Sequence, residues 1–204
     1  MTNIEIEAKV QVSDIGLLQQ RIADSGGTLV GEHLEINTYF DTTSGSLRST
    51  DQGLRVRVEQ GQDSRASRVT MSHKGPRVHG RLKTRAETEL VVSDARGALE
   101  FLSVLGYSRV LTFEKRRRRW RLDDCVVDVD TVPYLEDFVE IEGPSEQSVL
   151  AVRRKLGLDD APLIQASYVS MLWTYLAEHR INIDVVSFDN CGESAQPAPG
   201  ADGA

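Results

Sequence analysis

The sequence predicts an α+β domain whose core is an eight-stranded antiparallel β-barrel, with helices packed outside. Eight strand-like segments and four helix-like segments cover most of the chain, and its 204 residues suit one sizeable domain. Charged residues recur at every second position of those strands, opposite apolar faces. That alternation favours a closed sheet with a charged lumen.

The first strand and helix follow from periodicity and capping. Residues 4–10 alternate apolar and polar side chains, as a strand with two different faces does. Residues 13–25 are predicted to form a helix with Ser13 as N-cap, and Gly26-Gly27 end it.

The later elements are expected in the same way. Strands are predicted at 28–41, 54–59, 67–74, 82–92, 108–120, 121–131 and 135–142. Helices are predicted at 94–105, near 145–156 and near 163–179. Residues 1–180 therefore form the expected domain. Residues 184–204, rich in Gly, Pro, Ala and Ser, are expected to be a disordered tail.

Rows of charge are the most informative feature of the strands, because residues two apart point to one face. The rows are Glu5, Glu7 and Lys9; Arg55 and Arg57; Arg81, Lys83, Arg85, Glu87 and Glu89; Lys115, Arg117 and Arg119; Asp128 and Asp130; Glu140 and Glu142. Each row alone could be the solvated face of an open sheet. Their repetition across at least six strands favours a barrel lumen.

A lumen with so many charges needs compensating ions or water, since unpaired buried charges are prohibitively costly. A highly anionic ligand with divalent cations satisfies both sets of residues. Lys and Arg bind phosphate oxygens, and carboxylates bind Mg²⁺ or Mn²⁺.

The composition excludes several other classes. The net charge is -7 and the pI is about 5.2, so surface-wide attraction to nucleic acid or to an anionic membrane is not expected. No apolar run approaches the roughly 20 residues that span a bilayer, and the N-terminus lacks a signal-peptide core. Cys125 and Cys191 form no zinc or disulfide pattern. We expect a cytoplasmic protein.

An ordered set of motifs resembles the CYTH superfamily of class IV adenylyl cyclases and triphosphatases. The motifs are Glu5-Ile6-Glu7-Ala8-Lys9, Thr38-Tyr39-Phe40-Asp41-Thr42, Leu54-Arg55-Val56-Arg57, His73-Lys74-Gly75-Pro76, Lys83-Thr84-Arg85, Thr112-Phe113-Glu114-Lys115-Arg116-Arg117 and Phe138-Val139-Glu140-Ile141-Glu142. They span roughly residues 3–175. Asp41-Thr42 and the segment 138–142 are most similar to the class IV cyclase branch.

The resemblance implies a triphosphate tunnel with a divalent metal. The implied triphosphate ligands are Lys9, Arg57, Lys74, Lys115 and Arg117, helped by Arg55 and Arg85. The implied metal carboxylates are Glu5, Glu7 and Glu140, supported by Glu87, Glu89, Asp128 and Glu142. Glu5, Glu7, Lys9 and Glu140 are the expected catalytic residues. Asp128 is preferred to Asp130, although both lie on one face.

Some charged and aromatic residues are expected elsewhere. Arg116 and Arg118 are out of phase with the lumen row and should face solvent. His73 is expected at the surface, although it precedes the Lys-Gly-Pro turn. Ser167-Tyr168 resembles a family segment whose role the sequence leaves open.

Three functions stay open at this point. A cyclase would convert ATP to cyclic AMP and pyrophosphate through attack of the ribose 3′-hydroxyl on the α-phosphorus. A triphosphatase would hydrolyse inorganic triphosphate, thiamine triphosphate or a nucleoside triphosphate. A non-catalytic module would only bind polyphosphate or nucleotide. We favour the cyclase, and a homodimer through the apolar face of residues 168–176 is compatible with each.

Overall fold

The protein is described by a computed structural model, which places residues 2–61 and 67–191. Residues 62–66, between the strands predicted at 54–59 and 67–74, and the predicted tail from residue 192 lie outside the described residues.

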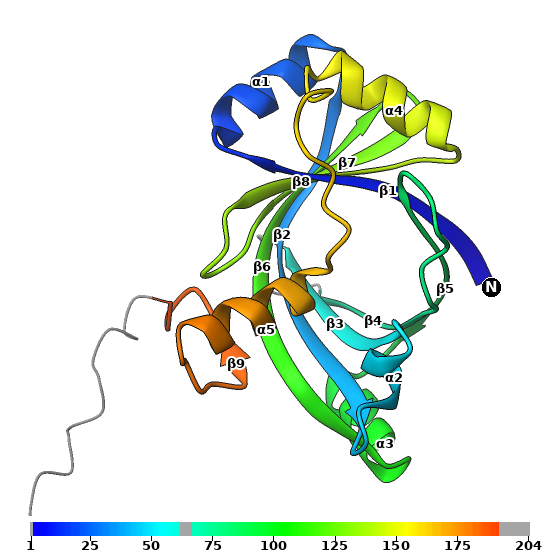
Figure 1. Ribbon diagram of the computed structural model, residues 1–204, viewed down its shortest axis with the longest axis vertical. Helices are drawn as coiled ribbons and strands as arrows, with labels where there is room; N and C mark the ends of the chain where they lie inside the picture. The colour runs from blue at the N-terminus through cyan, green and yellow to red at the C-terminus, as the bar shows by residue number, and fades with distance from the viewer. Residues whose placement is uncertain (1, 62–66, 192–204) are drawn as a thin grey trace, which may run out of the picture.

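Eight strands form a closed antiparallel barrel, which confirms the predicted fold class (Figure 1). The strands are β1 (Thr2–Val12), β2 (Thr28–Thr42), β3 (Gly53–Gly61), β4 (Ser67–Lys74), β5 (Lys83–Val92), β6 (Tyr107–Leu122), β7 (Cys125–Thr131) and β8 (Asp137–Glu142). Their order is β2-β3-β4-β5-β1-β8-β7-β6, and β2 also pairs with β6. That last pairing closes the sheet.

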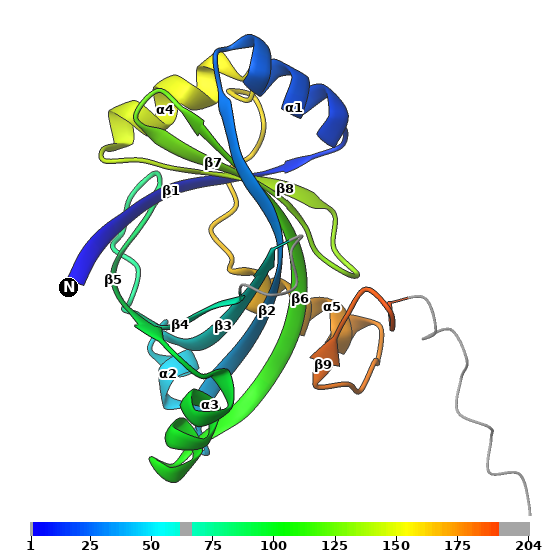
Figure 2. The ribbon, with the colours of Figure 1, turned by 180° about the vertical axis from the view of Figure 1, so that it is seen from behind.

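The helices are α1 (Ile15–Asp24), α2 (Ser46–Ser49), α3 (Ala95–Val104), α4 (Glu146–Lys155) and α5 (Tyr168–Glu178). Figures 1 and 2 show α1 and α4 side by side at one end of the molecule and α3 at the other. Leu18 and Ile22 of α1 pack with Val149 and Val152 of α4 on the apolar residues of β1, β7 and β8. These outer faces of the strands form the largest core cluster.

Helix α5 closes one end of the lumen. It packs against Phe113 and Phe138. Both share the strand face of the charged residues two positions later, Lys115 and Glu140, and therefore point inward. Tyr168, the first residue of α5, packs with Phe113 and Phe138 in the same cluster.

Three local differences from the expected elements have clear causes. Helix α5 begins at Tyr168 rather than near 163, because the backbone N–H of Ile164 is held by the carbonyl of Lys9 and Ser167 caps the helix. β6 continues to Leu122, and a turn with Asp123 at a φ of 54° precedes β7. The short helix α2 was not expected; the Asp41 carboxylate accepts hydrogen bonds from its Leu47 and Arg48 backbone N–H groups.

The start of the expected tail is ordered. Val185–Val186 forms β9, which pairs in parallel with Thr112 and Phe113 of β6. β7 pairs with β6 only from Arg116 onward, so β9 occupies the free edge that β7 leaves. The expectation of disorder is wrong for this short segment, because it completes the β6 hydrogen bonds.

Candidate functional site

A single cavity of about 270 Å³ gathers the charged residues that the sequence singles out, and we call it the narrow cavity. Its lining includes Glu5, Glu7, Lys9, Arg55, Arg57, Lys74, Arg85, Glu87, Glu89, Lys115, Arg117, Asp128, Glu140 and Glu142. The strand alternation places them there, since each belongs to the inward face of its strand.

The row on β1 is paired with cations from its neighbouring strands. Glu5 accepts hydrogen bonds from Lys74 and, at 3.1 Å, from the Arg85 Nε. Glu7 accepts one from Lys83. Burial alone would raise the pKa of Glu5, but Lys74, Lys83 and Arg85 lower it to about 2. Glu5 is therefore ionised at neutral pH.

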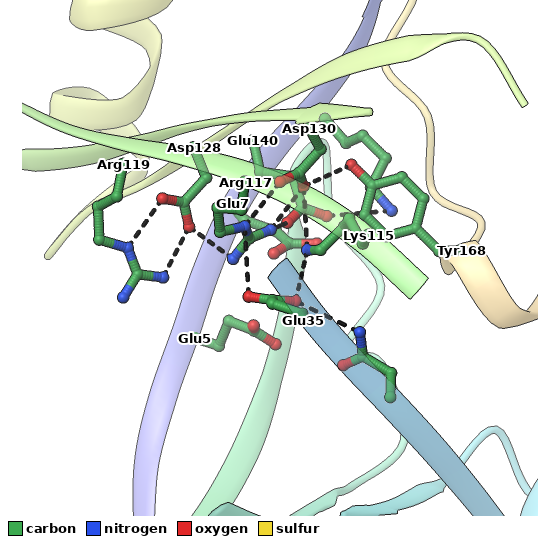
Figure 3. Close-up of polar contacts among 12 residues, drawn as sticks. Glu5, Glu7, Glu35, Lys115, Arg117, Arg119, Asp128, Asp130, Glu140 and Tyr168 are labelled. Carbon is green, nitrogen blue, oxygen red and sulfur yellow. Dashed lines mark hydrogen bonds and ion pairs between the residues drawn. The ribbon is translucent and has the colours of Figure 1, made fainter. Parts of the chain in front are cut away.

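A second cluster surrounds Glu35 of β2, whose side chain is fully buried. Its carboxylate lies 3.0 Å from Arg57 Nη1 and 3.1 Å from Lys115 Nζ. Arg117 Nε approaches it at 3.6 Å, and Figure 3 shows Lys115 and Arg117 at the Glu35 carboxylate. Burial would raise the pKa of Glu35, but these three cations hold it well below the usual range.

Arg117 links that cluster to β7 and β8. Its guanidinium lies 2.6 Å from carboxylate oxygens of Asp128, Asp130 and Glu140 (Figure 3). Asp128 also accepts two hydrogen bonds from Arg119, at 2.8 Å each. Asp128 and Asp130 both reach the site, and both oxygens of Asp128 are engaged by arginines.

Lys9 and Tyr168 join the α5 end of the lumen to the charged residues. The Lys9 ammonium lies 3.2 Å from Glu140, 3.0 Å from the Ala166 carbonyl and 3.8 Å from the centre of the Tyr168 ring. The Tyr168 hydroxyl donates to Asp130 at 2.8 Å. Burial lowers the pKa of Lys9, and Glu140 opposes that shift.

The carboxylates nearest the cavity mouth have fewer cationic partners than Glu35. Glu87 pairs with Lys74 at 3.2 Å, and Glu89 pairs with Arg68 at 3.3 Å. Glu142 is exposed and forms no ion pair with the residues that the structure describes. Desolvation and the negative charges of Glu5 and Glu7 raise its pKa to about 7. Such concentrated negative charge on oxygen ligands fits a divalent cation such as Mg²⁺ or Mn²⁺.

A second group of potential metal ligands lies deeper, where His33, Glu35 and Glu59 have ligand atoms within 4.8 Å of one another. Arg57 contacts both carboxylates, at 3.0 Å from Glu35 and 3.8 Å from Glu59. Glu35 also holds Lys115. Cations already pair with these oxygens, as they do with those of Glu5, Glu7 and Glu140. Glu142, in contrast, forms no ion pair with the described residues.

The lumen is close to neutral without a ligand. Ten cationic and eight acidic residues line the narrow cavity, and Glu35 and Asp130 lie buried against its cations. A triphosphate brings about four negative charges at neutral pH. Divalent metal would offset much of that charge, so this balance favours binding of the triphosphate together with metal.

A wide cavity of about 630 Å³ adjoins the narrow one. Both are lined by Tyr39, Arg55, Lys74, Lys83, Arg85 and Ser167. Trp173, Val169 and Ala177 of α5 give the wide cavity an apolar wall. Arg48 stacks on Trp173 at 5.0 Å, and Arg77 and Asp51, which also line this cavity, pair at 2.7 Å. Its volume falls in the range of pockets that bury small organic molecules.

Sequence reasoning overlooked several interior residues. Glu35 was not selected, although it and Asn37 alternate with the apolar residues of β2 and share the face of Tyr39. Lys83 was part of a charge row but was not assigned to the site. Tyr168 had no assigned role. Their partners come from strands distant in sequence, so no local pattern identifies them.

The residues predicted to lie outside do so. Arg116 and Arg118 are exposed. Arg116 stacks on Phe188 at 4.0 Å, and Arg118 pairs with Glu32 at 2.8 Å. His73 is exposed and contacts Gln52 at 3.0 Å. Both cysteines are free thiols. Over the described ranges, no helix is long and apolar enough to cross a membrane.

The structure is a closed antiparallel barrel with a charged lumen, and the sequence comparison gives a family of proteins that agrees with the resemblance seen in the motifs. Residues 3–168 match the CYTH domain family, so the chain belongs to that family.

Two relatives and one solved structure illustrate the match. A Methanocaldococcus jannaschii protein named as a candidate adenylate cyclase is 24% identical over 82% of this chain and 98% of its own length. The Aeromonas hydrophila adenylate cyclase CyaB is 27% identical over 80% of this chain and 86% of its own. The structure of a Hippeastrum protein, described as an adenylyl cyclase candidate with dominant triphosphatase activity, superposes with a TM-score of 0.62. It is 17% identical, over 83% of this chain and 95% of that one, and shows the shared fold.

Proposed function

We propose that the protein is a metal-dependent adenylyl cyclase that converts ATP to cyclic AMP and pyrophosphate. The observation that carries the proposal is the junction of the two cavities. The narrow cavity offers cations for a triphosphate, and the wide cavity offers about 630 Å³ with an apolar wall for a nucleoside. Inorganic triphosphate alone would leave the wide cavity unused.

In this proposal the cations of the narrow cavity hold the β- and γ-phosphates. Lys9, Arg57, Lys115 and Arg117 line it without lining the wide cavity. As the α-phosphorus is attacked, negative charge develops on the pyrophosphate leaving group. Cations already fixed by Glu35, Asp130 and Glu140 need no reorganisation to stabilise that charge.

Glu5, Glu7 and Glu140 are the proposed main metal ligands, with Glu142, Glu87, Glu89 and Asp128 in support. The bound metal would supply charge neutralisation and acidify the attacking hydroxyl. The carboxylates also hold Lys74, Lys83 and Lys9 in place before substrate arrives. Phosphate oxygens would take over part of those contacts when the substrate binds.

A second candidate is a triphosphatase, in which water attacks the terminal phosphorus. It uses the same carboxylates and cations, and the dominant triphosphatase activity named for the structurally similar Hippeastrum protein supports it. The two functions differ in which cavities they need. Hydrolysis of inorganic triphosphate requires only the narrow cavity, whereas cyclisation requires the ribose to reach the α-phosphorus at the junction.

Product identification separates these functions. Purified protein is incubated with ATP, then with inorganic triphosphate, in Mg²⁺ or Mn²⁺. The proposal expects equal amounts of cyclic AMP and pyrophosphate from ATP. Orthophosphate as the main product from either substrate would establish the triphosphatase instead. Binding of both ligands without turnover would leave a binding module.

A further inference from the structure

One interior row of the barrel, Tyr39, Arg55 and Ser72, holds two buried polar atoms without hydrogen-bond partners among the described residues. Arg55 of β3 stands opposite Tyr39 of β2 on one side and Ser72 of β4 on the other. Directly opposed side chains on one face of a sheet lie about 5 Å apart at Cβ. Arg55 is thus flanked by neutral polar residues, as Arg57 is by Asn37 and Thr70. Lys9, Arg85 and Lys115 instead stand opposite carboxylates.

Arg55 is a buried guanidinium whose carboxylate neighbours lie beyond hydrogen-bond distance. Only 7% of the residue is exposed, and the nearest carboxylate oxygen, on Glu87, is 4.0 Å from its Nη2. Its Nε has no hydrogen-bond partner among the described residues. Arg57, two residues along β3, instead donates from Nε to Asn37 at 2.9 Å and pairs with Glu35 at 3.0 Å.

Ser72 presents a second unsatisfied donor beside Arg55. The residue is 1% exposed, and its Oγ also lacks a hydrogen-bond partner within the described part of the chain. Buried polar groups are nearly always hydrogen-bonded, so each exception calls for an explanation. Two such donors on neighbouring strands of one row indicate a shared acceptor that is not part of the protein.

The row lies where the cavities meet. Arg57 lines only the narrow cavity, Arg55 lines both, and Ser72 lines only the wide one. The local potential is positive. Burial alone would raise the pKa of the Tyr39 hydroxyl, but Arg55, Lys74, Arg57 and Arg85 lower it below its ordinary value.

We propose that Arg55 and Ser72 form a subsite for the phosphate that adjoins the wide cavity, which is the esterified α-phosphate of a nucleoside triphosphate. The Arg55 Nε–H and the Ser72 hydroxyl both donate to its non-bridging oxygens. This inference rests on the proposed triphosphate binding and assigns a role to Ser72. It also places these donors on the phosphorus that cyclisation attacks, where they orient the phosphate toward the nucleoside.

The subsite has a consequence for shorter ligands. Pyrophosphate can be held by the cations deep in the narrow cavity without reaching the junction. Tripolyphosphate and ATP carry a third phosphate, which extends to Arg55 and Ser72. Loss of the Ser72 hydroxyl should therefore weaken binding of the longer ligands selectively.

The test compares Ser72→Ala with the wild-type protein by titration calorimetry, with Ca²⁺ in place of Mg²⁺ to slow turnover. A hydrogen bond to a charged phosphate corresponds to about tenfold in affinity. We expect tripolyphosphate and ATP to bind about tenfold more weakly and pyrophosphate to bind as before. The melting temperature of the ligand-free variant should not fall, because the hydroxyl loses no hydrogen bond. Thr70→Val is the matched control, since Thr70 is buried on the same face of β4 and is not among the described residues lining either cavity.

Unchanged affinity for tripolyphosphate, or an equal loss for pyrophosphate, would overturn the subsite. A loss of the same size in Thr70→Val would also overturn it, because the effect would then come from general packing. Failure of the proposed function would give a different set of results from failure of the subsite. A protein that binds tripolyphosphate in a Ser72-dependent way and forms no cyclic AMP keeps the subsite and loses the cyclase. A wild-type protein that binds no tripolyphosphate overturns both.

Discussion

The Glu35 carboxylate holds the cations of the lumen together, and its replacement by glutamine tests that role. Glu35→Gln keeps the shape of the side chain but removes its charge. Arg57, Lys115 and Arg117 then lose a shared counter-ion that is fully buried. Breaking a buried ion pair costs roughly 3–5 kcal/mol, and the glutamine oxygen retains part of the hydrogen bonding, so we expect about 3 kcal/mol.

That loss converts to a measurable shift. For a protein of 204 residues, each kcal/mol lowers the melting temperature by about 2–4 °C. Differential scanning calorimetry of Glu35→Gln without ligand should show a melting temperature roughly 6–12 °C below wild type. Tripolyphosphate with Mg²⁺ should then stabilise the variant more than the wild-type protein, since the lumen has gained net positive charge.

The matched control is Glu32→Gln, on the same strand. Glu32 pairs with Arg118 at 2.8 Å on the exposed outer face, where an ion pair contributes roughly 0–1 kcal/mol. Its melting temperature should therefore change little. Equal shifts for the two variants would refute the conclusion that Glu35 organises the lumen.

The pH dependence gives an independent check. The pKa of Glu35 is held well below its usual range, with Arg57, Lys115 and Arg117 outweighing the effect of burial. A lowered carboxyl pKa contributes stability that is present above the unfolded-state pKa and is lost as the pH falls through the folded-state pKa. The difference between Glu35→Gln and wild type should thus be full at pH 7 and shrink in acid, below about pH 4.

Three further changes test other parts of the site. Glu7→Gln should lower the rate of metal-dependent turnover at least about a hundredfold, while circular dichroism shows an intact fold. Unchanged activity would show that Glu7 is not a metal ligand. Lys74→Ala should weaken triphosphate binding far more than monophosphate binding in calorimetry, and equal losses would argue against the phosphate assignment. Glu142→Gln should raise the metal-free melting temperature at pH 8 but not at pH 5, because the raised pKa of about 7 makes ionised Glu142 unfavourable in the folded state. Solvent at the cavity mouth will reduce that shift, and no difference between the two pH values would contradict it.

Alternation within strands made much of the fold predictable. A residue two positions from Glu5 must share its face, so Glu7 and Lys9 could be placed in the lumen before any partner was known. The capped helices at residues 13–25 and 94–105 were predictable for a similar reason, since Asp94 caps α3 by a local contact. Asp14, rather than Ser13, caps α1, a shift of one residue.

The pairings across the lumen were not predictable in that way. Glu35 meets Lys115 and Arg57 only because β2 pairs with both β6 and β3. That closure is a property of the whole sheet, and no spacing along the chain reveals it. The late start of α5 has the same origin, because Ile164 is held by a backbone hydrogen bond to Lys9, far away in the sequence.

The wide cavity likewise depends on tertiary structure. Trp173 packs within the α5 cluster, as an aromatic residue on a helix commonly does. It also lines the wide cavity, which adjoins the narrow one. Both roles follow from α5 lying across the end of the barrel, which the helical pattern of residues 168–178 alone does not indicate.

The central claim is that metal and triphosphate bind together in the charged lumen. Crystals grown with Mn²⁺ and a slowly reacting ATP analogue locate both directly, because manganese gives an anomalous signal. We predict manganese beside Glu5 and Glu7, phosphates among Lys9, Arg57, Lys115 and Arg117, and the nucleoside in the wide cavity. Phosphates bound outside the barrel, or manganese held only by His33, Glu35 and Glu59, would contradict the account.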